Sequence, residues 1–257
     1  SLIHSVIIWS YLEEINSNSF VFNLEIIAVC VRIFELLRRF KLVLAIVLLP
    51  FCFAIGKLFW ELVFMTDFSG LMLIPLIAGM TCMSLLYLYL PKPIWIYVLG
   101  HEFTHAIATM LCGGRVKGMK VTSDGGHVYV TRDNFFVTLS PYFIPIYAIF
   151  VFAVFALIQH FLNLQNSPMI WGLFFWALGL SYCFHVFLTA HILRTRQPDI
   201  VSQGYLFSAV VIYLGNMMVL FVGLILISVG LEIGQVAREM YVEAIKAYLV
   251  IGDMAQN

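Results

Sequence analysis

Residues 169–193 read MIWGLFFWALGLSYCFHVFLTAHIL, an uncharged run that is long enough to cross a lipid bilayer as one helix. The run closes a longer stretch, residues 134–193, that contains no Asp, Glu, Lys or Arg, and residues 200–231 are equally uncharged. Because one crossing takes about 20 apolar residues, the first stretch accommodates two crossings, separated by a polar break at 163–168. These runs predict the fold class, an all-α polytopic membrane protein.

The composition of the whole chain supports the same class. Hydrophobic residues make up 62% of the chain and charged residues 11%, whereas soluble domains carry about 25% charged residues. The mean hydropathy is +0.98. The formal net charge is zero, so there is no electrostatic case for a nucleic acid partner. We therefore expect a multi-pass integral membrane protein of the cell or inner membrane, surrounded by lipid and without a nucleic acid partner.

Hydropathy and charge divide the chain into three parts. We expect an N-terminal amphipathic or interfacial segment at 1–40, a polytopic core at 41–230 and a C-terminal amphipathic surface helix at 231–257. Within the core, about six transmembrane helices are expected, at 42–65, 71–90, 94–112, 136–161, 169–193 and 203–230. Between the third and fourth of these, residues 115–132 are polar and β-branched around Ser123-Asp124-Gly125-Gly126, which predicts a small β-hairpin.

The third expected crossing contains the motif His101-Glu102-Phe103-Thr104-His105. Residues four apart share one face of a helix, so His101 and His105 can direct both imidazoles at one Zn²⁺. Glu102 lies about 100° further around the helix, beside such a metal, where it can deprotonate a bound water. The alternative is a buried helix whose polar groups satisfy backbone or hydroxyl partners. Because an ionised carboxylate in mid-bilayer costs roughly 2.5–3.5 kcal/mol, the motif favours a zinc hydrolase with Glu102 as its catalytic residue.

A catalytic zinc takes three protein ligands, so one more donor is needed. Alternating crossings bring residues 194–199 to the same membrane face as the end of the motif helix, and Asp199 is the acidic residue of that segment. An ordinary helix N-terminal carboxylate is the alternative interpretation of Asp199. His127, His185 and His191 compete as ligands. The last two are six residues apart and point about 240° from each other, so at most one of them faces the site.

These residues together resemble the site-2 protease class of intramembrane zinc metallopeptidases. The resemblance covers residues 92–216 and rests on the histidine motif, Gly113-Gly114, the hairpin, the stretch 139–145 and Gln197-Pro198-Asp199. It implies one Zn²⁺ per chain, with metal ligands His101, His105 and Asp199 and the catalytic residue Glu102. It also implies a membrane protein substrate that is cut in or near a transmembrane segment.

The chain departs from the pattern of this class in two places. Gln197 and Ile200 differ from the Asn-Pro-Asp-Gly element, and the asparagine of the Gly-Pro-x-x-Asn element is missing after Pro141, so the chain resembles a divergent member. Asn216 and His127 are candidates for the group that stabilises the oxyanion. The strand at 127–131 either offers an edge to an extended substrate or caps the site.

Two other functions fit parts of the pattern. One is a catalytically inactive membrane subunit of the same fold that binds transmembrane partners, although the intact Glu102 argues against it. The other is a membrane di-iron desaturase, because His101-x-x-x-His105 also matches a first histidine box. The sequence has no His-x-x-His-His pair and no second Glu-x-x-His, so a two-iron centre lacks ligands.

Overall fold

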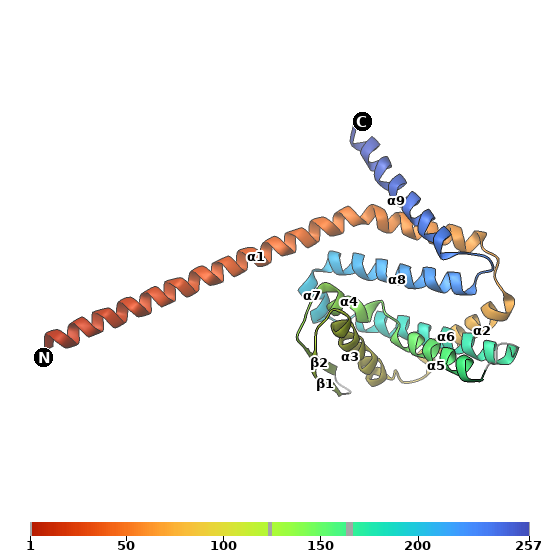
Figure 1. Ribbon diagram of the computed structural model, residues 1–257, viewed down its shortest axis with the longest axis horizontal. Helices are drawn as coiled ribbons and strands as arrows, with labels where there is room; N and C mark the ends of the chain where they lie inside the picture. Colours follow the sequence, from red (N-terminus) through yellow and green to blue (C-terminus); the bar gives the residue numbers. More distant parts are fainter. Residues whose placement is uncertain (1, 123–124, 163–166, 257) are drawn as a thin grey trace. The chain divides into compact units, whose positions relative to one another are not determined.

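The computed structural model, drawn in Figure 1, describes the backbone of residues 2–122, 125–162 and 167–256. The chain divides into two compact units, Ser1–Leu44 and Ala45–Asn257. The side chains of residues 1–31, 33–34, 251 and 255–257 lie outside the description, as do the expected turn residues Ser123 and Asp124 and most of the expected polar break at 163–168. In chain order the elements are α1 (Leu2–Met65), α2 (Gly70–Tyr89), α3 (Ile94–Leu111), β1 (Val116–Thr122), β2 (Gly125–Val130), α4 (Phe135–Leu139), η1 (Ser140–Tyr142), α5 (Ile146–Leu162), α6 (Pro168–Ile192), α7 (Pro198–Gln203), α8 (Tyr205–Ile227) and α9 (Ile233–Gln256).

The protein is a helical, multi-pass integral membrane protein. Among the described residues, four helices are long and apolar enough to cross a membrane: Glu35–Met65 within α1, then α2, α6 and α8. The bent pair formed by α4–η1 and α5 makes a fifth if it is counted as one span. The motif helix α3 is not among them, because its two histidines and its glutamate lower the mean hydropathy of its 18 residues. The expected number of six crossings therefore becomes four or five by length and composition.

The prediction of one continuous membrane helix at 136–161 is wrong. The chain instead forms α4 and η1, breaks, and continues as α5 at an angle of 79°. Pro141 and Pro145 have no backbone N–H to continue the helical ladder through this region. Asn134 caps the start of α4, where its side chain accepts a 2.9 Å hydrogen bond from the Val137 N–H. The uncharged sequence hid this break, which leaves α4 and η1 packed against α3.

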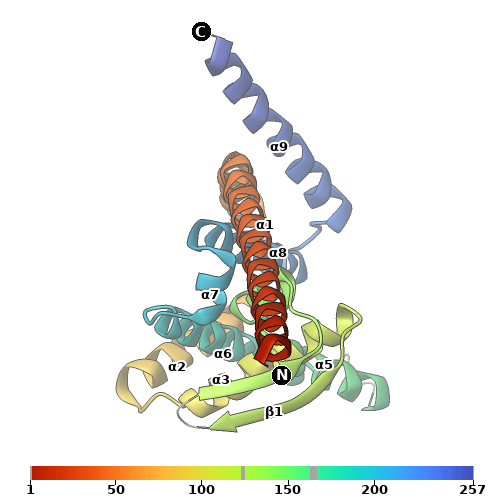
Figure 2. The same cartoon turned by 90° about the vertical axis from the view of Figure 1, so that its left-hand side faces the viewer.

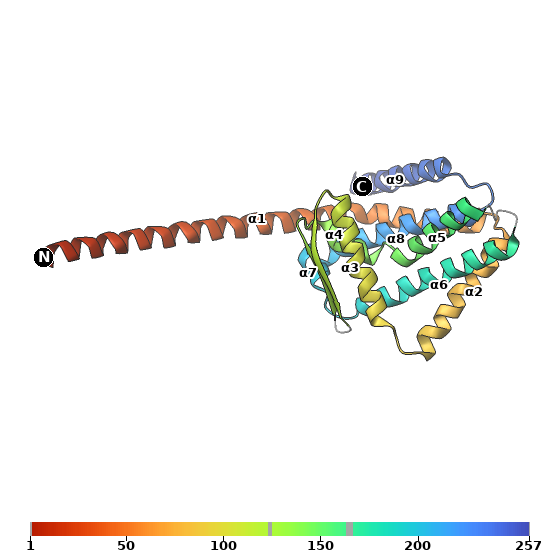
Figure 3. The same ribbon diagram turned by 60° about the horizontal axis from the view of Figure 1, so that its bottom comes forward.

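Helices α2 and α6 pack along each other as the closest helix pair of the core, as Figure 3 shows. Their crossing point contains two glycines. A methyl group on Gly79 would collide with the carbonyl oxygen of Trp176, and one on Gly179 would collide with that of Leu76. Small residues that let two backbones touch are the usual device for joining helices in lipid, where the hydrophobic effect does not drive them together.

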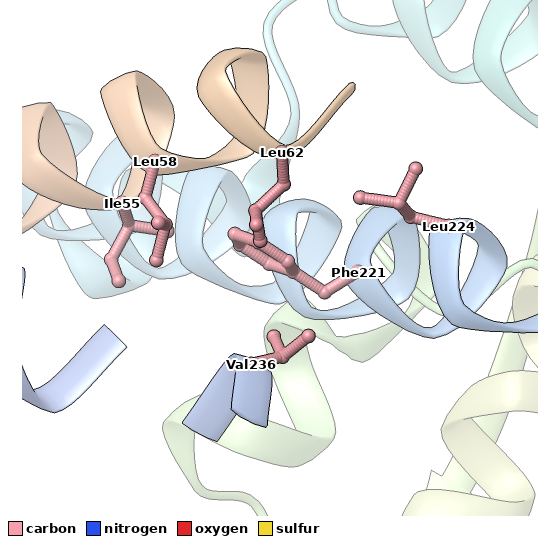
Figure 4. Packing of buried hydrophobic residues seen from close by; sticks show 6 residues of the cluster. All are labelled: Ile55, Leu58, Leu62, Phe221, Leu224 and Val236. Carbon is pink, nitrogen blue, oxygen red and sulfur yellow. The ribbon is translucent and has the colours of Figure 1, made fainter. Parts of the chain in front are cut away.

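A second packed region joins the membrane-spanning part of α1 to α8 and α9. Its buried apolar side chains, drawn in Figure 4, are Ile55, Leu58, Leu62, Phe221, Leu224 and Val236. Polar contacts hold α9 along α1: the Lys57 ammonium lies 3.2 Å from a carboxylate oxygen of Glu243, and the Tyr248 hydroxyl donates to the Val47 carbonyl at 2.8 Å. Helix α9 is therefore docked on α1 by both apolar and ionic contacts.

A third cluster sets the position of α3 against α2 and α6. Its buried members are Met83, Tyr97, Cys183, Phe184 and Leu188. The Tyr97 hydroxyl lies 3.2 Å from the Thr189 hydroxyl on α6. On the other side of α3, the Tyr147 hydroxyl of α5 donates to the Ile96 carbonyl. The helix that carries the histidine motif is thus held from two sides by the rest of the bundle.

The predicted hairpin is present as an antiparallel pair of strands that lies across α3 (Figure 2). Thr122 pairs with Gly125 and Lys120 with His127, and the register shifts between Val116 and Gly118. The second strand begins at Gly125, two residues earlier than the sequence indicates. These two extra residues bring glycine backbone directly over the motif helix.

Candidate metal centre

His101 and His105 project from one face of α3, one turn apart. Their ring centroids are 4.8 Å apart and the rings meet edge to face. The two side chains are only 11% and 14% exposed, although the helix is otherwise built from apolar and small residues. The motif helix therefore presents two imidazoles together inside the protein.

Asp199 reaches these imidazoles from α7, a short helix that starts at Pro198 and lies beside α4 (Figure 1). One oxygen of Asp199, Oδ2, lies 3.4 Å from His101 Nε2 and 3.5 Å from His105 Nε2. The chain turns directly after α7 at Gly204, whose φ of +93° is a conformation that suits glycine. This turn lets α7 stop short of α8 and direct its first residues at α3.

The distances from Asp199 Oδ2 to the two histidine Nε2 atoms fit a tetrahedral zinc site. With zinc–ligand distances of about 2.0–2.2 Å, two ligand atoms of a tetrahedron lie about 3.4 Å apart, whereas N–H···O hydrogen bonds are centred near about 2.9 Å. The donor atoms of His101, His105 and Asp199 all lie within 4.8 Å of one another. Two imidazoles and one carboxylate are also a donor set that zinc accepts in catalytic sites, where a fourth position stays open.

The charge of Asp199 depends on the same contacts. Burial raises the pKa of its carboxyl group, but the neighbouring imidazoles of His101 and His105 outweigh burial and hold the pKa well below its ordinary range. The group is therefore a carboxylate at neutral pH, which is the form that binds a metal.

Two further contacts orient the donors. The other ring nitrogen of His105, Nδ1, lies 2.8 Å from the Val137 carbonyl oxygen of α4. The Tyr142 hydroxyl of η1 donates a 3.0 Å hydrogen bond to Asp199 Oδ2. Contacts of this kind fix the tautomer and direction of metal ligands. Sequence reasoning missed both residues: Tyr142 lies in the stretch 139–145 that carries the family resemblance, but a backbone carbonyl such as that of Val137 leaves no sequence signal.

Glu102 lies beside the donor cluster and beneath the hairpin. The residue is 7% exposed. A methyl group on Gly126 of β2 would come within 2.5 Å of Glu102 Cγ and 2.8 Å of a Val98 methyl. The hairpin backbone is therefore in direct contact with the side chain that the sequence identifies as the catalytic carboxylate.

The remaining candidates lie outside this cluster. In the described part of the chain, the group with metal-binding geometry consists of His101, His105 and Asp199 alone. His127 packs its ring against Tyr129 in the hairpin, with centroids 4.8 Å apart. His191 lies 3.5 Å from the Tyr87 hydroxyl.

Asn216 is engaged elsewhere. Its amide nitrogen donates to the carbonyls of Tyr142, at 3.2 Å, and Ile212, at 2.9 Å. The bond to Tyr142 holds η1 against α8, and the bond to Ile212 lies within α8 itself, so neither N–H group is left to stabilise an oxyanion. His127 stays a prediction for that role.

Comparisons with known proteins give one match, to a family model. The chain matches the Peptidase M50B-like family model over residues 77–194, which include the histidine motif and the hairpin. Asp199 lies just beyond the matched segment. Neither the curated proteins nor the solved structures gave a match. The expected resemblance to the site-2 protease class is confirmed at the level of the family, through the similarity of residues 77–194 of this membrane protein to the Peptidase M50B-like family.

Proposed function

We propose that this protein is an intramembrane zinc metalloprotease that hydrolyses peptide bonds in or near the transmembrane segments of membrane protein substrates. The observation that carries the proposal is the convergence of the donor atoms of His101, His105 and Asp199, which lie within 4.8 Å of one another, with Asp199 Oδ2 at 3.4 and 3.5 Å from the two histidine Nε2 atoms. The family match supports a protease of this class. Zinc, the metal ligands and the nature of the substrate are part of the proposal.

The three donors would hold one zinc ion through the Nε2 atoms of the two histidines and the Oδ2 atom of Asp199. When bound, zinc supplies a water of lowered pKa and a Lewis acid for the scissile carbonyl. The Val137 carbonyl keeps the proton of His105 on Nδ1, so its Nε2 stays available as a ligand atom. The Tyr142 hydroxyl holds Asp199 in the orientation that faces both imidazoles.

Glu102 performs the proton transfers. Its carboxylate accepts a proton from the attacking water and delivers it to the nitrogen of the leaving amine. The motif sets it one residue from His101, on the side of α3 that faces the hairpin. Its near-complete burial protects this carboxylate from competing contacts with solvent.

Water and substrate must both reach this site. The Asp199 side chain is 26% exposed, more than those of the two histidines, so it marks the more open side of the cluster. A transmembrane helix must unwind before its carbonyl can be attacked, and its freed backbone groups then need partners. The hairpin beside Glu102 has strand edges that can pair with an extended peptide.

The test measures zinc and proteolysis together. Zinc content is determined by elemental analysis of the purified protein, and new N-termini are mapped in membranes of cells that express wild type, Glu102→Gln or Asp199→Ala. We expect about one zinc per chain in wild type and Glu102→Gln. We expect new N-termini within transmembrane segments only in wild type, because loss of a general base lowers rates by about 10²–10⁴-fold.

Glu61→Gln serves as the matched control, since Glu61 contacts Lys57 on α1 and is remote from the motif. It should retain both zinc and proteolysis. Zinc binding with identical N-termini in wild type and Glu102→Gln would favour the inactive binding subunit. Absence of zinc from wild type would refute the metal centre, and undiminished zinc in Asp199→Ala would remove Asp199 as a ligand.

A further inference from the structure

Two ring nitrogens near the proposed zinc site are buried and unsatisfied. Within the described chain, His101 Nδ1 and His185 Nε2 have no hydrogen-bond partner. His185 belongs to α6 and is only 5% exposed. A buried polar atom without a partner is costly, so two of them on residues that line one cavity point to a bound group that satisfies both.

Both histidines line the same small cavity. It lies between α3, η1, α5 and α6, and its walls also include Thr104, Tyr147 and Phe184. The space open to the centre of a water molecule is about 10 Å³, which is close to the roughly 10–15 Å³ that one buried water needs. The cavity is therefore of a size for one water and too small for a substrate or cofactor.

Hydrogen-bond chemistry sets the direction of each contact. If His101 binds zinc through Nε2, its Nδ1 carries the proton and must donate it. His185 can then offer an unprotonated Nε2 as an acceptor. The two atoms are not in direct contact, since neither has a partner in the described chain. A water between them would accept from His101 and donate to His185.

Thr104 offers a third partner to such a water. Thr104 is a lining residue of the cavity, and its hydroxyl donates a 2.7 Å hydrogen bond to the Gly100 carbonyl, so its oxygen lone pairs stay available. Buried waters typically make about three hydrogen bonds. The three side chains around the cavity supply that number.

We propose that His185 is a positioning residue for the zinc ligand His101, and that it acts through one water molecule held in the cavity between them. The inference rests on the proposed zinc site. The sequence left His185 as a competing ligand, and the geometry assigns it to the opposite nitrogen of His101 instead. His185 would thus fix the tautomer and ring direction of His101 without touching the metal.

The test compares zinc affinities, measured by competition with a chelator, in the full-length protein. His185→Phe removes the acceptor while keeping a flat ring, and we expect zinc binding to weaken by about 10–100-fold. His185→Gln keeps an acceptor oxygen and should restore most of the affinity. His191→Phe, on the same helix but outside the cavity, should bind zinc as wild type does.

Two additional readouts separate positioning from packing. The absorption spectrum of bound Co²⁺ should change in His185→Phe and return toward wild type in His185→Gln. In the zinc-loaded wild type, ¹⁵N NMR of labelled histidines should show His101 protonated at Nδ1 and His185 unprotonated at Nε2. This last measurement requires no variant to fold.

The results that would refute the role of His185 differ from the results that would refute the proposed zinc protease. Failure of the wild type to bind zinc would refute the metal centre. Normal zinc binding together with unchanged affinity in His185→Phe, or a proton on His185 Nε2, would overturn the role of His185 while leaving the protease proposal intact. A lower melting temperature of the metal-free His185→Phe protein at unchanged zinc affinity would assign His185 to packing and would also overturn it.

Discussion

The crossing of α2 and α6 and the surroundings of α3 are built in opposite ways. At the crossing, two continuous helices meet at Gly79 and Gly179, backbone against backbone. Around α3, the chain is interrupted: α4 and η1 break away from α5, and α7 ends before α8. The crossing of α2 and α6 joins long apolar helices. The broken helices around α3 instead bring polar side chains and backbone carbonyls close to the two histidines of the motif.

The difference shows where a membrane protein can tolerate irregular backbone. In lipid, every backbone polar group needs a partner, so broken helices persist only where protein or a polar cavity satisfies them. The carbonyls of Val137 and Tyr142, at the break before α5, accept hydrogen bonds from His105 and Asn216. Substitutions around α3 should therefore change metal binding or proteolysis. Substitutions at the crossing of α2 and α6 should instead lower the stability of the fold.

The largest effect is expected at the contact between the hairpin and Glu102. Gly126→Ala places a methyl group 2.5 Å from Glu102 Cγ, so either the glutamate side chain or the hairpin must shift. A displacement of about 1 Å of a catalytic group can cost about 100-fold in rate. We expect that loss in proteolysis, with zinc content unchanged.

Gly118→Ala in β1 is the matched control, because a methyl group there meets only a Tyr129 ring atom at an ordinary 3.8 Å. Full proteolysis by Gly126→Ala would mean that the hairpin does not constrain Glu102.

The hydroxyl of Tyr142 allows a second test of the α3 region. Tyr142→Phe removes the hydrogen bond to Asp199 Oδ2 but keeps a ring in a position that is 1% exposed. Loss of such a supporting contact typically weakens metal binding by about 10–100-fold, which chelator competition measures. Tyr205→Phe changes a largely exposed tyrosine at the start of α8 and should have no effect. Equal zinc affinities of the two variants would contradict the role of Tyr142.

A substitution at the crossing of α2 and α6 should lower the stability of the protein and leave metal binding unchanged. Gly179→Ala forces a methyl group against the Leu76 carbonyl, and overpacking of this kind costs about 1–3 kcal/mol. We expect a lower melting temperature in detergent, with unchanged zinc stoichiometry in the folded fraction. Gly172→Ala, on the same helix, adds its methyl group to open space and should melt as wild type does. A wild-type melting temperature for Gly179→Ala would show that α2 and α6 are not in close contact.

The smallest effect concerns the polar contacts of α9, which lie away from α3. Hydrogen bonds from Lys246 and Lys57 lower the pKa of Glu243 below its ordinary value. A carboxylate of this kind stabilises the folded state above its unfolded pKa, and the contribution is lost as the pH falls through the lowered value.

Hydrogen exchange of α9, corrected for the intrinsic rate, measures this contribution. The corrected exchange rate should be constant from neutral pH to about pH 5 and should increase below about pH 4. The pH step should be absent in Glu243→Gln. The same step in both proteins would exclude Glu243 as its source.

The sequence predicted the parts of this architecture that depend on hydropathy and on helix periodicity. The long uncharged runs indicate α6 and α8, and the four-residue spacing of His101 and His105 puts both on one face of α3. The sequence also predicted that Asp199 approaches that face, and its Oδ2 lies 3.4 and 3.5 Å from the two histidine Nε2 atoms. The helix features follow from local chemistry, whereas the count of crossings behind the Asp199 prediction was not met in full.

Other features depend on tertiary contacts. The break before α5 was missed because hydropathy continues through it, and Pro141 and Pro145 were its only local signs. Four or five helices qualify as spans by length and composition, against about six expected, because the polar motif lowers the mean hydropathy of α3. Asn216 looked available for catalysis in the sequence, yet it donates to the Ile212 carbonyl of its own helix and to the Tyr142 carbonyl, which only the fold brings near.

Asn216 also bears on the order in which this protein matures. It anchors the Tyr142 backbone to α8, while the Tyr142 hydroxyl holds Asp199 and the Val137 carbonyl holds His105. Hydrogen bonds from other parts of the protein thus support two of the three proposed ligands, His105 and Asp199, whereas a zinc finger lacks such support and stays unfolded until metal arrives. We therefore expect the chain to assemble in the bilayer first and to be charged with metal afterwards, so that stripping by a chelator leaves an intact apoprotein that can be recharged.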